Sequence, residues 1–291
     1  MSQAFIARLA DRGVVSVTGP DAAKLLQGLV TNDVAHLPAG QAAHAALLSA
    51  QGKILFDFIA VRSTDGYLLD VARDKAADLV KRLTMYKLRA NVTIKDASDE
   101  YAVLALWGDN HASSGETSGT VSFIDPRASA LGRRILAETA FAADIASATN
   151  GSDTDAAAYH AHRIEVGVPE GGKDYDFGDA YPHEANFDLF NGVSFAKGCY
   201  VGQEIVARMQ HKTVVRKRVV RVTGDRKLPS DRPEILAGDV VIGKLGSVSV
   251  AHGLALLRLD RAEEFAAKGT PLTAGGVPIR LSQPAGGPIR S

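Results

Sequence analysis

The chain has 291 residues, among them 28 Gly, 11 Pro and a single Cys, and its 33 Lys and Arg balance its 33 Asp and Glu. Its content of 46% apolar and 23% charged residues is typical of globular proteins, which excludes disordered and fibrous classes. A net charge of zero argues against a protein that holds duplex nucleic acid through its phosphates, so we expect no nucleic-acid partner. The length predicts two or three domains.

The single Cys limits the chemistry of the chain. It excludes an intrachain disulfide framework, a Cys-only zinc site and an iron–sulfur cluster held by this chain's thiolates alone. A lone thiol also fits a reducing compartment. The first residues carry Arg8, Asp11 and Arg12 where a signal peptide would have an apolar core, and no apolar run is long enough to span a membrane. These observations predict a soluble cytoplasmic protein with no membrane partner.

Apolar spacing and turn residues predict a mixture of strands and helices along the first two thirds of the chain. A strand is expected at 14–17, and the helix that follows opens at Thr18-Gly19-Pro20-Asp21. Further strands are predicted at 43–48, 54–61, 67–72, 88–95 and 101–107, and helices at 74–85, 138–149 and 155–166. The stretch 52–107 thus reads as a β-β-α-β-β module with an antiparallel sheet. A loop is expected at 111–120, and the long polar segment 170–193 is of a kind that is often functional.

The C-terminal part of the chain changes character after Lys212. Short Val-, Ile- and Leu-rich runs alternate there with Gly, Pro and Asp turns, which predicts strands at 214–223, 239–243, 246–249, 254–259 and 277–282. This spacing is typical of a small antiparallel barrel. We therefore expect a domain boundary near 212.

The most specific local motif is the run Lys197-Gly198-Cys199-Tyr200-Val201-Gly202-Gln203-Glu204. Its two Gly indicate a tight turn or a close approach of the backbone. A helix is predicted directly after it, and the unpaired N–H groups at a helix start, together with Lys197, favour the thiolate form of Cys199. The residues alone leave two other interpretations open. In the first, Cys199 is a small buried apolar residue. In the second, it is a nucleophile paired with His183 or His211, although nothing in the sequence places either His beside it.

His160 and His162 are the one pair that invites a metal interpretation. On the predicted helix these two side chains face different directions, so they cannot easily share an ion. No metal site is predicted.

The motif KGCYVGQE resembles the signature of the YgfZ family of folate-dependent iron–sulfur cluster maintenance proteins. That family is related to the glycine-cleavage T-protein, an aminomethyltransferase. The resemblance runs through most of the chain, in the segments Leu26-Gln27-Gly28, Thr31-Asn32-Asp33-Val34, Gln51-Gly52-Lys53, Asp125-Pro126-Arg127, Leu131-Gly132-Arg133, Arg163-Ile164-Glu165-Val166-Gly167-Val168-Pro169, Pro182-His183-Glu184-Ala185-Asn186, Ala207-Arg208 and Lys217-Arg218. The T-protein lacks the Cys of this signature, so Cys199 favours the YgfZ side of the resemblance.

This resemblance implies an α+β, T-protein-like three-part fold, with ferredoxin-like α+β modules and a C-terminal antiparallel β-barrel. The implied domains are a folate-binding α+β domain at 1–50 and 125–212, an inserted ferredoxin-like β-β-α-β-β domain at 51–124, and a small β-barrel domain at 213–291. Tetrahydrofolate or a derivative is then expected in the middle of the molecule.

The resemblance also carries residue roles. Cys199 is implied as the functional thiol, with Lys197 beside it. The implied folate-binding residues are Glu184, Arg208, Asn32, Asp33, Gln203 and Glu204. Glu184 is the first choice, because a carboxylate can accept hydrogen bonds from the donor edge of a pterin ring. Arg208 is a partner for the ligand or for Glu204, and Asn32 and Asp33 either contact the ligand or brace their own loop.

The implied function is assembly or repair of iron–sulfur clusters, with iron–sulfur client proteins or assembly factors as partners and folate as the bound cofactor. One alternative is a folate-dependent one-carbon or aminomethyl transferase of the T-protein type. The T-protein's catalytic Asp has no clear counterpart here, since Asp74 and Asp78 both fall in the corresponding region. The other alternative is a folate-binding module without chemistry, so the chain's status as an enzyme stays open.

Overall fold

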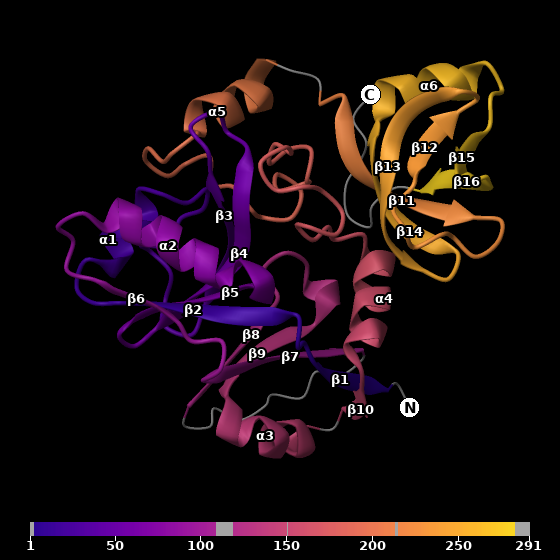
Figure 1. The fold of residues 1–291 in the computed structure, drawn as a ribbon. Coiled ribbons are helices and arrows are strands. Elements are labelled where there is room, and N and C mark those ends of the chain that lie inside the picture. The colour runs from indigo at the N-terminus through magenta and orange to yellow at the C-terminus, as the bar shows by residue number, and fades with distance from the viewer. Residues whose placement is uncertain (1–2, 109–118, 150, 213–214, 283–291) are drawn as a thin grey trace. The chain divides into compact units, whose positions relative to one another are not determined.

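The computed structural model describes residues 3–108, 119–149, 151–212 and 215–282. The chain forms two compact units that each draw on several chain segments. Unit 1 contains Met1–Leu48, Leu55–Tyr159 and Asn191–Val201, and unit 2 contains Ser49–Ile54, His160–Phe190 and Gly202–Ser291. Figure 1 labels the elements of both units. No helix in the described ranges is long and apolar enough to cross a membrane.

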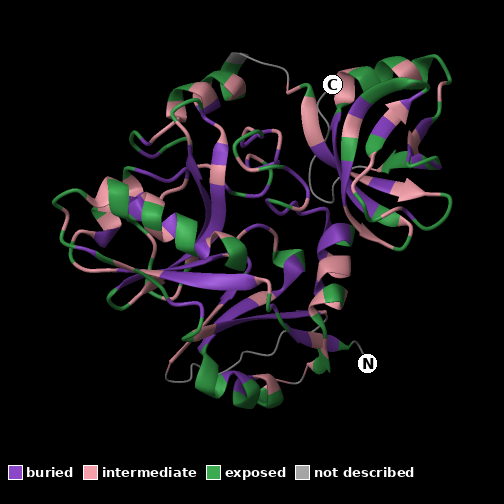
Figure 2. Ribbon diagram, viewed as in Figure 1, coloured by how far each residue is buried: buried purple, intermediate pink, exposed green. Residues whose placement is uncertain are grey.

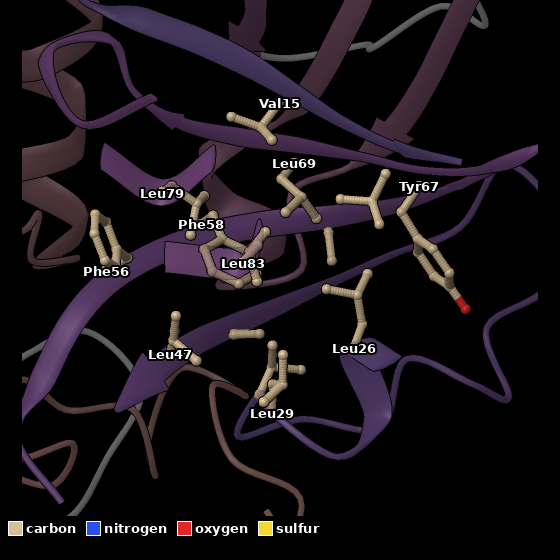
Figure 3. Packing of buried hydrophobic residues seen from close by; sticks show 14 of the residues in the cluster. Val15, Leu26, Leu29, Leu47, Phe56, Phe58, Tyr67, Leu69, Leu79 and Leu83 are labelled. Atoms are coloured by element: carbon tan, nitrogen blue, oxygen red, sulfur yellow. The ribbon is translucent and has the colours of Figure 1, made fainter. Parts of the chain in front are cut away.

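The first sheet of unit 1 has the order β3-β4-β5-β2-β6. Its strands are β2 (Arg12–Thr18), β3 (Ala42–Leu48), β4 (Ile54–Ser63), β5 (Gly66–Ala72) and β6 (Thr93–Asp96), and the helices α1 (Ala22–Gln27) and α2 (Ala76–Lys87) pack on it. Figure 3 shows the core between them, where Leu26, Leu79 and Leu83 from the helices meet Phe58 and Leu69 from the strands. Alternate strand residues point to the opposite face and enter a second core, so both faces of this sheet are buried. Burial on both faces explains the nearly continuous apolar run of β4.

The second sheet of unit 1 has the order β10-β1-β7-β9-β8. Its strands are β1 (Ala4–Arg8), β7 (Tyr101–Gly108), β8 (Thr120–Ile124), β9 (Arg133–Glu138) and β10 (Ser152–Thr154), and α3 (Ala142–Ala148) covers its outer face. The stretch 52–107 therefore does not form one sheet, because β7 pairs with β1 and β9 and not with β6. Apolar alternation predicts a strand but not its partner, and the partners of β7 lie far from it in sequence.

A buried ionic cluster joins the two sheets of unit 1. Asp70 of β5 pairs with Arg12 at 2.7 Å and with Arg134 of β9 at 3.1 Å. Asp125 pairs with Arg127 at 2.7 Å and with Arg134 at 3.2 Å. Burial alone would raise the pKa of Asp125, but the charges and hydrogen bonds of Arg127 and Arg134 hold that pKa well below its usual value. The cluster fixes the Asp125-Pro126-Arg127 segment, which in turn contacts the candidate site.

Unit 2 contains a closed barrel with the strand order β11-β14-β13-β12-β15-β16. Its elements are β11 (Lys217–Gly224), β12 (Glu234–Ala237), β13 (Val240–Ser249), β14 (His252–Arg258), α6 (Leu259–Ala267), β15 (Leu272–Ala274) and β16 (Val277–Ser282). Two further helices, α4 (Ala156–Val166) and α5 (Gln203–Lys212), precede the barrel in the chain. The prediction of a C-terminal antiparallel barrel is confirmed.

A buried Arg ties the segment after α4 to the barrel within unit 2. Arg163 is fully buried, pairs with Asp174 at 2.7 Å and donates to the Ser247 Oγ of β13 at 2.8 Å. The other oxygen of Asp174 accepts a hydrogen bond from the Ser247 amide at 2.7 Å. These contacts fix the start of the long polar segment 170–190, most of whose residues are buried (Figure 2) although it contains no helix or long strand.

Most of the predicted elements are present, with shifted ends. The two short strands predicted at 239–243 and 246–249 are one bulged strand, β13. The sequence analysis missed β1, β8, β9, β10, β12, β15 and α6. Several of these are only three to five residues long, which is too short for a period to be recognised. The loop predicted at 111–120 falls almost entirely outside the described residues.

Candidate functional site

The candidate site is built around Cys199, on the irregular segment Asn191–Val201 of unit 1. Cys199 is a free, exposed cysteine. This exposure is what a functional thiol requires, and it contradicts the interpretation of Cys199 as a buried apolar residue. A Cβ added at Gly198 would meet no atom of the described residues within 4 Å, so packing does not require a Gly at this position. Phe195 is 48% exposed on the same segment. The thiol is therefore displayed at the surface of its unit.

Lys197 holds this segment in place. Its side chain is buried, and its ammonium donates to three main-chain carbonyls: Gln27 at 2.8 Å, Val30 at 2.7 Å and Asn32 at 2.7 Å. Burial lowers the pKa of Lys197 to about 8, and the nearby charge of Asp33 acts in the opposite direction. A Lys ammonium has three N–H donors, so all of them are taken by these carbonyls. These hydrogen bonds anchor the segment that carries the thiol, and the predicted effect of Lys197 on Cys199 stays a prediction.

Thr31 and Asn32 brace the beginning of the same segment. Thr31 Oγ1 donates to the Gly192 carbonyl at 2.6 Å, and Asn32 Nδ2 donates to the Asn191 carbonyl at 2.6 Å. Asn191 in turn donates to the Pro126 carbonyl at 3.0 Å, next to the buried ionic cluster. These contacts make Asn32 a structural brace of the thiol segment.

Asp33 has local partners of its own. Its carboxylate lies 2.9 Å from His36 Nδ1 and accepts a hydrogen bond from Gln27 at 3.1 Å. Burial alone would raise the pKa of Asp33, but the hydrogen bonds and the charge of His36 outweigh this effect. The pKa of Asp33 therefore lies below its usual value. The loop-bracing role left open for Asn32 and Asp33 is thus visible in their contacts, and their folate role stays a prediction.

Tyr200 closes the far end of the thiol segment. Its ring is buried, with the Lys197 ammonium 5.3 Å from the ring centroid, and burial raises the pKa of Tyr200 to about 12. Val201 packs against the first core of unit 1. Both flanks of Cys199 are therefore held by buried neighbours while the thiol itself is exposed.

Glu184 lies in unit 2, in the turn that follows Tyr181. One oxygen of its half-buried carboxylate accepts a hydrogen bond from the Tyr181 amide at 2.9 Å, and its main-chain carbonyl accepts one from the Val219 amide of β11 at 2.9 Å. Asn186 adopts a left-handed backbone (φ 60°) and donates to the Val219 carbonyl at 2.7 Å. The carboxylate orientation is thus fixed by its own turn and by the adjacent strand, which suits a carboxylate that accepts from a pterin.

The other predicted folate residues of unit 2 lie on α5. Gln203 is its first residue, and Arg208 pairs with Glu204 at 3.0 Å, with both side chains largely exposed. His183 Nε2 lies 3.0 Å from the Gln210 Oε1 of the same helix.

Two Asp lie in the region where the resemblance leaves the counterpart of the T-protein's catalytic Asp open. Asp74 and Asp78 are exposed, and they lie 3.7 Å and 3.4 Å from the ammonium groups of Lys75 and Lys81. Among the described residues there is also no group of three or more His, Cys, Asp or Glu that could hold a metal ion.

The predicted site residues are divided between the two units. Cys199, Lys197, Asn32 and Asp33 belong to unit 1, and Glu184, Gln203, Glu204 and Arg208 belong to unit 2. Within unit 1 the structure brings Lys197 to Asn32, and within unit 2 it brings Glu204 to Arg208. The sequence analysis missed the bracing roles of Gln27 and Thr31, although both lie in segments that carried the family resemblance.

Comparisons with known proteins agree with the fold. Residues 4–113 match the GCVT N-terminal domain, and residues 216–288 match the CAF17 C-terminal beta-barrel domain. The solved glycine cleavage system aminomethyltransferase T from Bartonella henselae superposes with a TM-score of 0.77 over 97% of this chain and 86% of that one, at 16% identity. The chain thus has the T-protein-like α+β fold with a C-terminal barrel, as predicted.

Sequence relatives give the family. The mouse "Iron-sulfur cluster assembly factor IBA57, mitochondrial" is 35% identical over 87% of this chain and 77% of its own length. A homologue from Mycosarcoma maydis is 39% identical over 74% of this chain and 56% of its own length, and one from Neurospora crassa is matched over 53% of its length. The chain therefore spans about half the length of these two fungal relatives. It belongs to the IBA57 (CAF17) family of proteins with a T-protein-like fold.

Two predictions change in the light of these relatives. The family relation to the T-protein is confirmed, but the matching relatives carry the IBA57 name, and the narrower YgfZ assignment stays a prediction. The predicted cytoplasmic location is wrong by this comparison, because the relatives from Mycosarcoma maydis, Neurospora crassa, mouse and human are named mitochondrial. The cytoplasmic prediction rests on the lone thiol, the charged first residues and the lack of a long apolar run, and none of these features distinguishes the cytoplasm from the mitochondrion.

Proposed function

We propose that this chain acts in the assembly of iron–sulfur clusters and that Cys199 is its functional thiol. The observation that carries the proposal is an exposed Cys199 on a segment held by the three hydrogen bonds of a buried Lys197. The names of the IBA57 relatives support the role in assembly, and the mitochondrial location in those names supports a mitochondrial site of action. The partners proposed are iron–sulfur client proteins or other assembly factors.

The cluster is cargo that this chain shares with another molecule. A cluster takes about four thiolates, and Cys199 supplies one of them. The remaining ligands then come from a partner protein, a second copy of this chain or a small thiol. An exposed thiol supports a second use as well: the Cys199 thiolate attacks a disulfide of a client, a mixed disulfide forms, and the other client sulfur leaves as a thiolate.

Tetrahydrofolate or a derivative is the proposed cofactor, with Glu184 as its main polar contact. The carboxylate is half-buried, and the Tyr181 amide occupies only one of its oxygens in the hydrogen bond at 2.9 Å. A fixed carboxylate of this kind is suited to accept hydrogen bonds from the ring N–H and amino group of a pterin. Arg208, Gln203, Glu204, Asn32 and Asp33 are the further contacts proposed.

Anaerobic reconstitution tests the shared-ligand proposal. Purified chain is mixed with ferrous iron and sulfide, with and without glutathione, and the visible absorbance of the cluster is recorded. We expect the monomeric wild-type chain to hold a cluster only when glutathione is present, and we expect no cluster in Cys199→Ser. A stable, stoichiometric cluster on the wild-type monomer without added thiol would contradict sharing, and equal loading of Cys199→Ser would contradict the role of the thiol.

Calorimetric titration with tetrahydrofolate tests the cofactor separately. Loss of one partner of a buried charged hydrogen bond costs about 1.5–3 kcal/mol, so Glu184→Ala is expected to bind about ten- to a hundredfold more weakly. Glu263→Ala, an exposed substitution on α6, is the matched control and keeps wild-type affinity. Equal affinity of wild type and Glu184→Ala would remove Glu184 from the site.

A further inference from the structure

A pocket of about 440 Å³ lies between α1 and the end of α2 in unit 1. Leu25, Leu29 and Tyr86 form its apolar part, and all three belong to or pack against the first core of this unit. The pocket is therefore an open hollow whose apolar part adjoins the core. None of the residues predicted for the thiol or folate sites lines it.

Leu88 stands at the rim of this pocket and is the most exposed large apolar side chain among the described residues. It is 86% exposed and adopts a left-handed backbone (φ 47°), which bulky residues rarely do. Met85, at the end of α2, is 69% exposed. Burying such side chains against a partner is favourable, whereas leaving them in water is not.

The backbone around Leu88 is fixed. The Ala90 amide donates to the Lys87 carbonyl at 2.8 Å, and the Asn91 amide donates to the carboxylate of Asp21 at 2.7 Å. Gly19 permits this arrangement, because a Cβ there would lie only 2.5 Å from the Asn91 carbonyl oxygen. Leu88 is thus held outward by its neighbours and needs no ordering when a partner binds.

Positive charge predominates around the pocket. Lys24, Lys87 and Arg89 line it, and none of the three makes an ion pair or side-chain hydrogen bond with the described residues. The single carboxylate of the pocket, Asp21, already accepts the hydrogen bond from Asn91. Three unpaired cations beside an apolar opening are complementary to an acidic partner that carries an apolar side chain.

We propose that this pocket is a docking site for an acidic segment of a partner protein. One large apolar side chain of that segment enters between α1 and α2 and contacts Leu88, while its carboxylates face Lys24, Lys87 and Arg89. The inference concerns a surface distinct from Cys199 and does not depend on the iron–sulfur proposal.

Fluorescence polarisation with synthetic peptides tests the docking site on the full chain. The probe is a short labelled peptide with Leu and Phe on one helical face and Glu and Asp on the other. Two companion peptides replace either the acidic residues by Lys or the apolar residues by Ser. We expect only the first peptide to bind, and we expect its affinity to fall as salt is raised.

Variants locate the binding. Lys87→Glu combined with Arg89→Glu should weaken the acidic peptide at least about tenfold, and Leu88→Ser should weaken it about tenfold or more. Lys227→Glu, an exposed charge reversal in the barrel unit, is the matched control and should match the wild type within experimental error. These side chains are largely solvent-facing, so the variants should keep the wild-type melting temperature.

Three outcomes would overturn the proposal. The acidic peptide does not bind the wild type, it binds the Leu88→Ser and double charge-reversal variants as tightly as the wild type, or it binds no better than its Ser-substituted companion. Binding of phosphatidylglycerol vesicles without binding of the peptide would assign the surface to a membrane instead and would also contradict the proposal.

Discussion

The thiol segment of unit 1 and the Glu184 turn of unit 2 display their functional groups in different ways. Cys199 is exposed, and its segment is anchored by Lys197, whose buried ammonium donates hydrogen bonds to three main-chain carbonyls. Glu184 is half-buried, and its own carboxylate and carbonyl take part in holding the turn. The proposed functional thiol is thus kept outside the network that anchors its segment, whereas the carboxylate proposed for folate is part of the network that holds its turn.

The largest effect is expected when the anchor of the thiol segment is removed. Lys197→Met keeps the length of the side chain but leaves three carbonyls without their donor, which should lower the free energy of unfolding by about 2–4 kcal/mol. Denaturant unfolding of the variant beside Lys227→Met, an exposed Lys, measures the difference. A loss below about 1 kcal/mol would show that Lys197 does not anchor the segment.

The Glu184 turn has an anchor of its own in Arg218 of β11. Its guanidinium pairs with both oxygens of Asp188, at 2.9 and 2.7 Å, and donates to the His183 carbonyl at 2.8 Å. Because this pair is partly exposed, Arg218→Met should cost about 1–3 kcal/mol. A double-mutant cycle with Asp188→Asn checks it, and additive effects of the two substitutions would contradict a coupled pair.

These anchors mark the limit of what the sequence predicts. Local patterns were sufficient for most of the longer strands, for α1, α2, α4 and α5, and for the barrel. The pattern around Lys197 shows a Lys two residues before a Cys, which favours an electrostatic role. Its actual partners, Gln27, Val30 and Asn32, lie about 165–170 residues away, and no local period reports such a contact.

The strand pairing in the second sheet of unit 1 could not be predicted from the sequence either. The run 101–107 was predicted as a strand because of its apolar residues, yet its partners β1 and β9 come from distant parts of the chain. Short strands such as β10 depend on those partners and have no pattern of their own. Family resemblance supplied the three-part fold where the periodicity could not.

The two Gly of the Cys motif should differ in their tolerance to substitution. Gly202 has φ 82°, a left-handed conformation that costs Ala about 1–2 kcal/mol, whereas a Cβ at Gly198 meets no atom within 4 Å. Thermal unfolding of Gly202→Ala and Gly198→Ala compares them directly. We expect a lower melting temperature only for Gly202→Ala, and equal losses would contradict this interpretation of the motif.

A dependence on pH is also expected. Because burial lowers the pKa of Lys197 from 10.5 to about 8, its ammonium is disfavoured in the folded chain relative to the unfolded one. That penalty is fully present below pH 8 and is relieved as pH rises toward 10.5, since the unfolded chain then binds more protons. The unfolding free energy of wild type minus that of Lys197→Met should therefore rise over this interval. A flat or falling difference would show that the pKa of Lys197 is not lowered.

The central claim is that the exposed thiol of Cys199 performs the function in iron–sulfur cluster assembly. Its most direct test is complementation of cells depleted of their own IBA57 family protein, with this chain fused to a mitochondrial targeting segment. The activity of an iron–sulfur enzyme is measured in cells that contain equal levels of the wild type or of Cys199→Ser. Equal melting temperatures of the two purified proteins show that the substitution leaves the fold intact. We predict restored activity with wild type and none with Cys199→Ser, whereas full rescue by Cys199→Ser would contradict the claim.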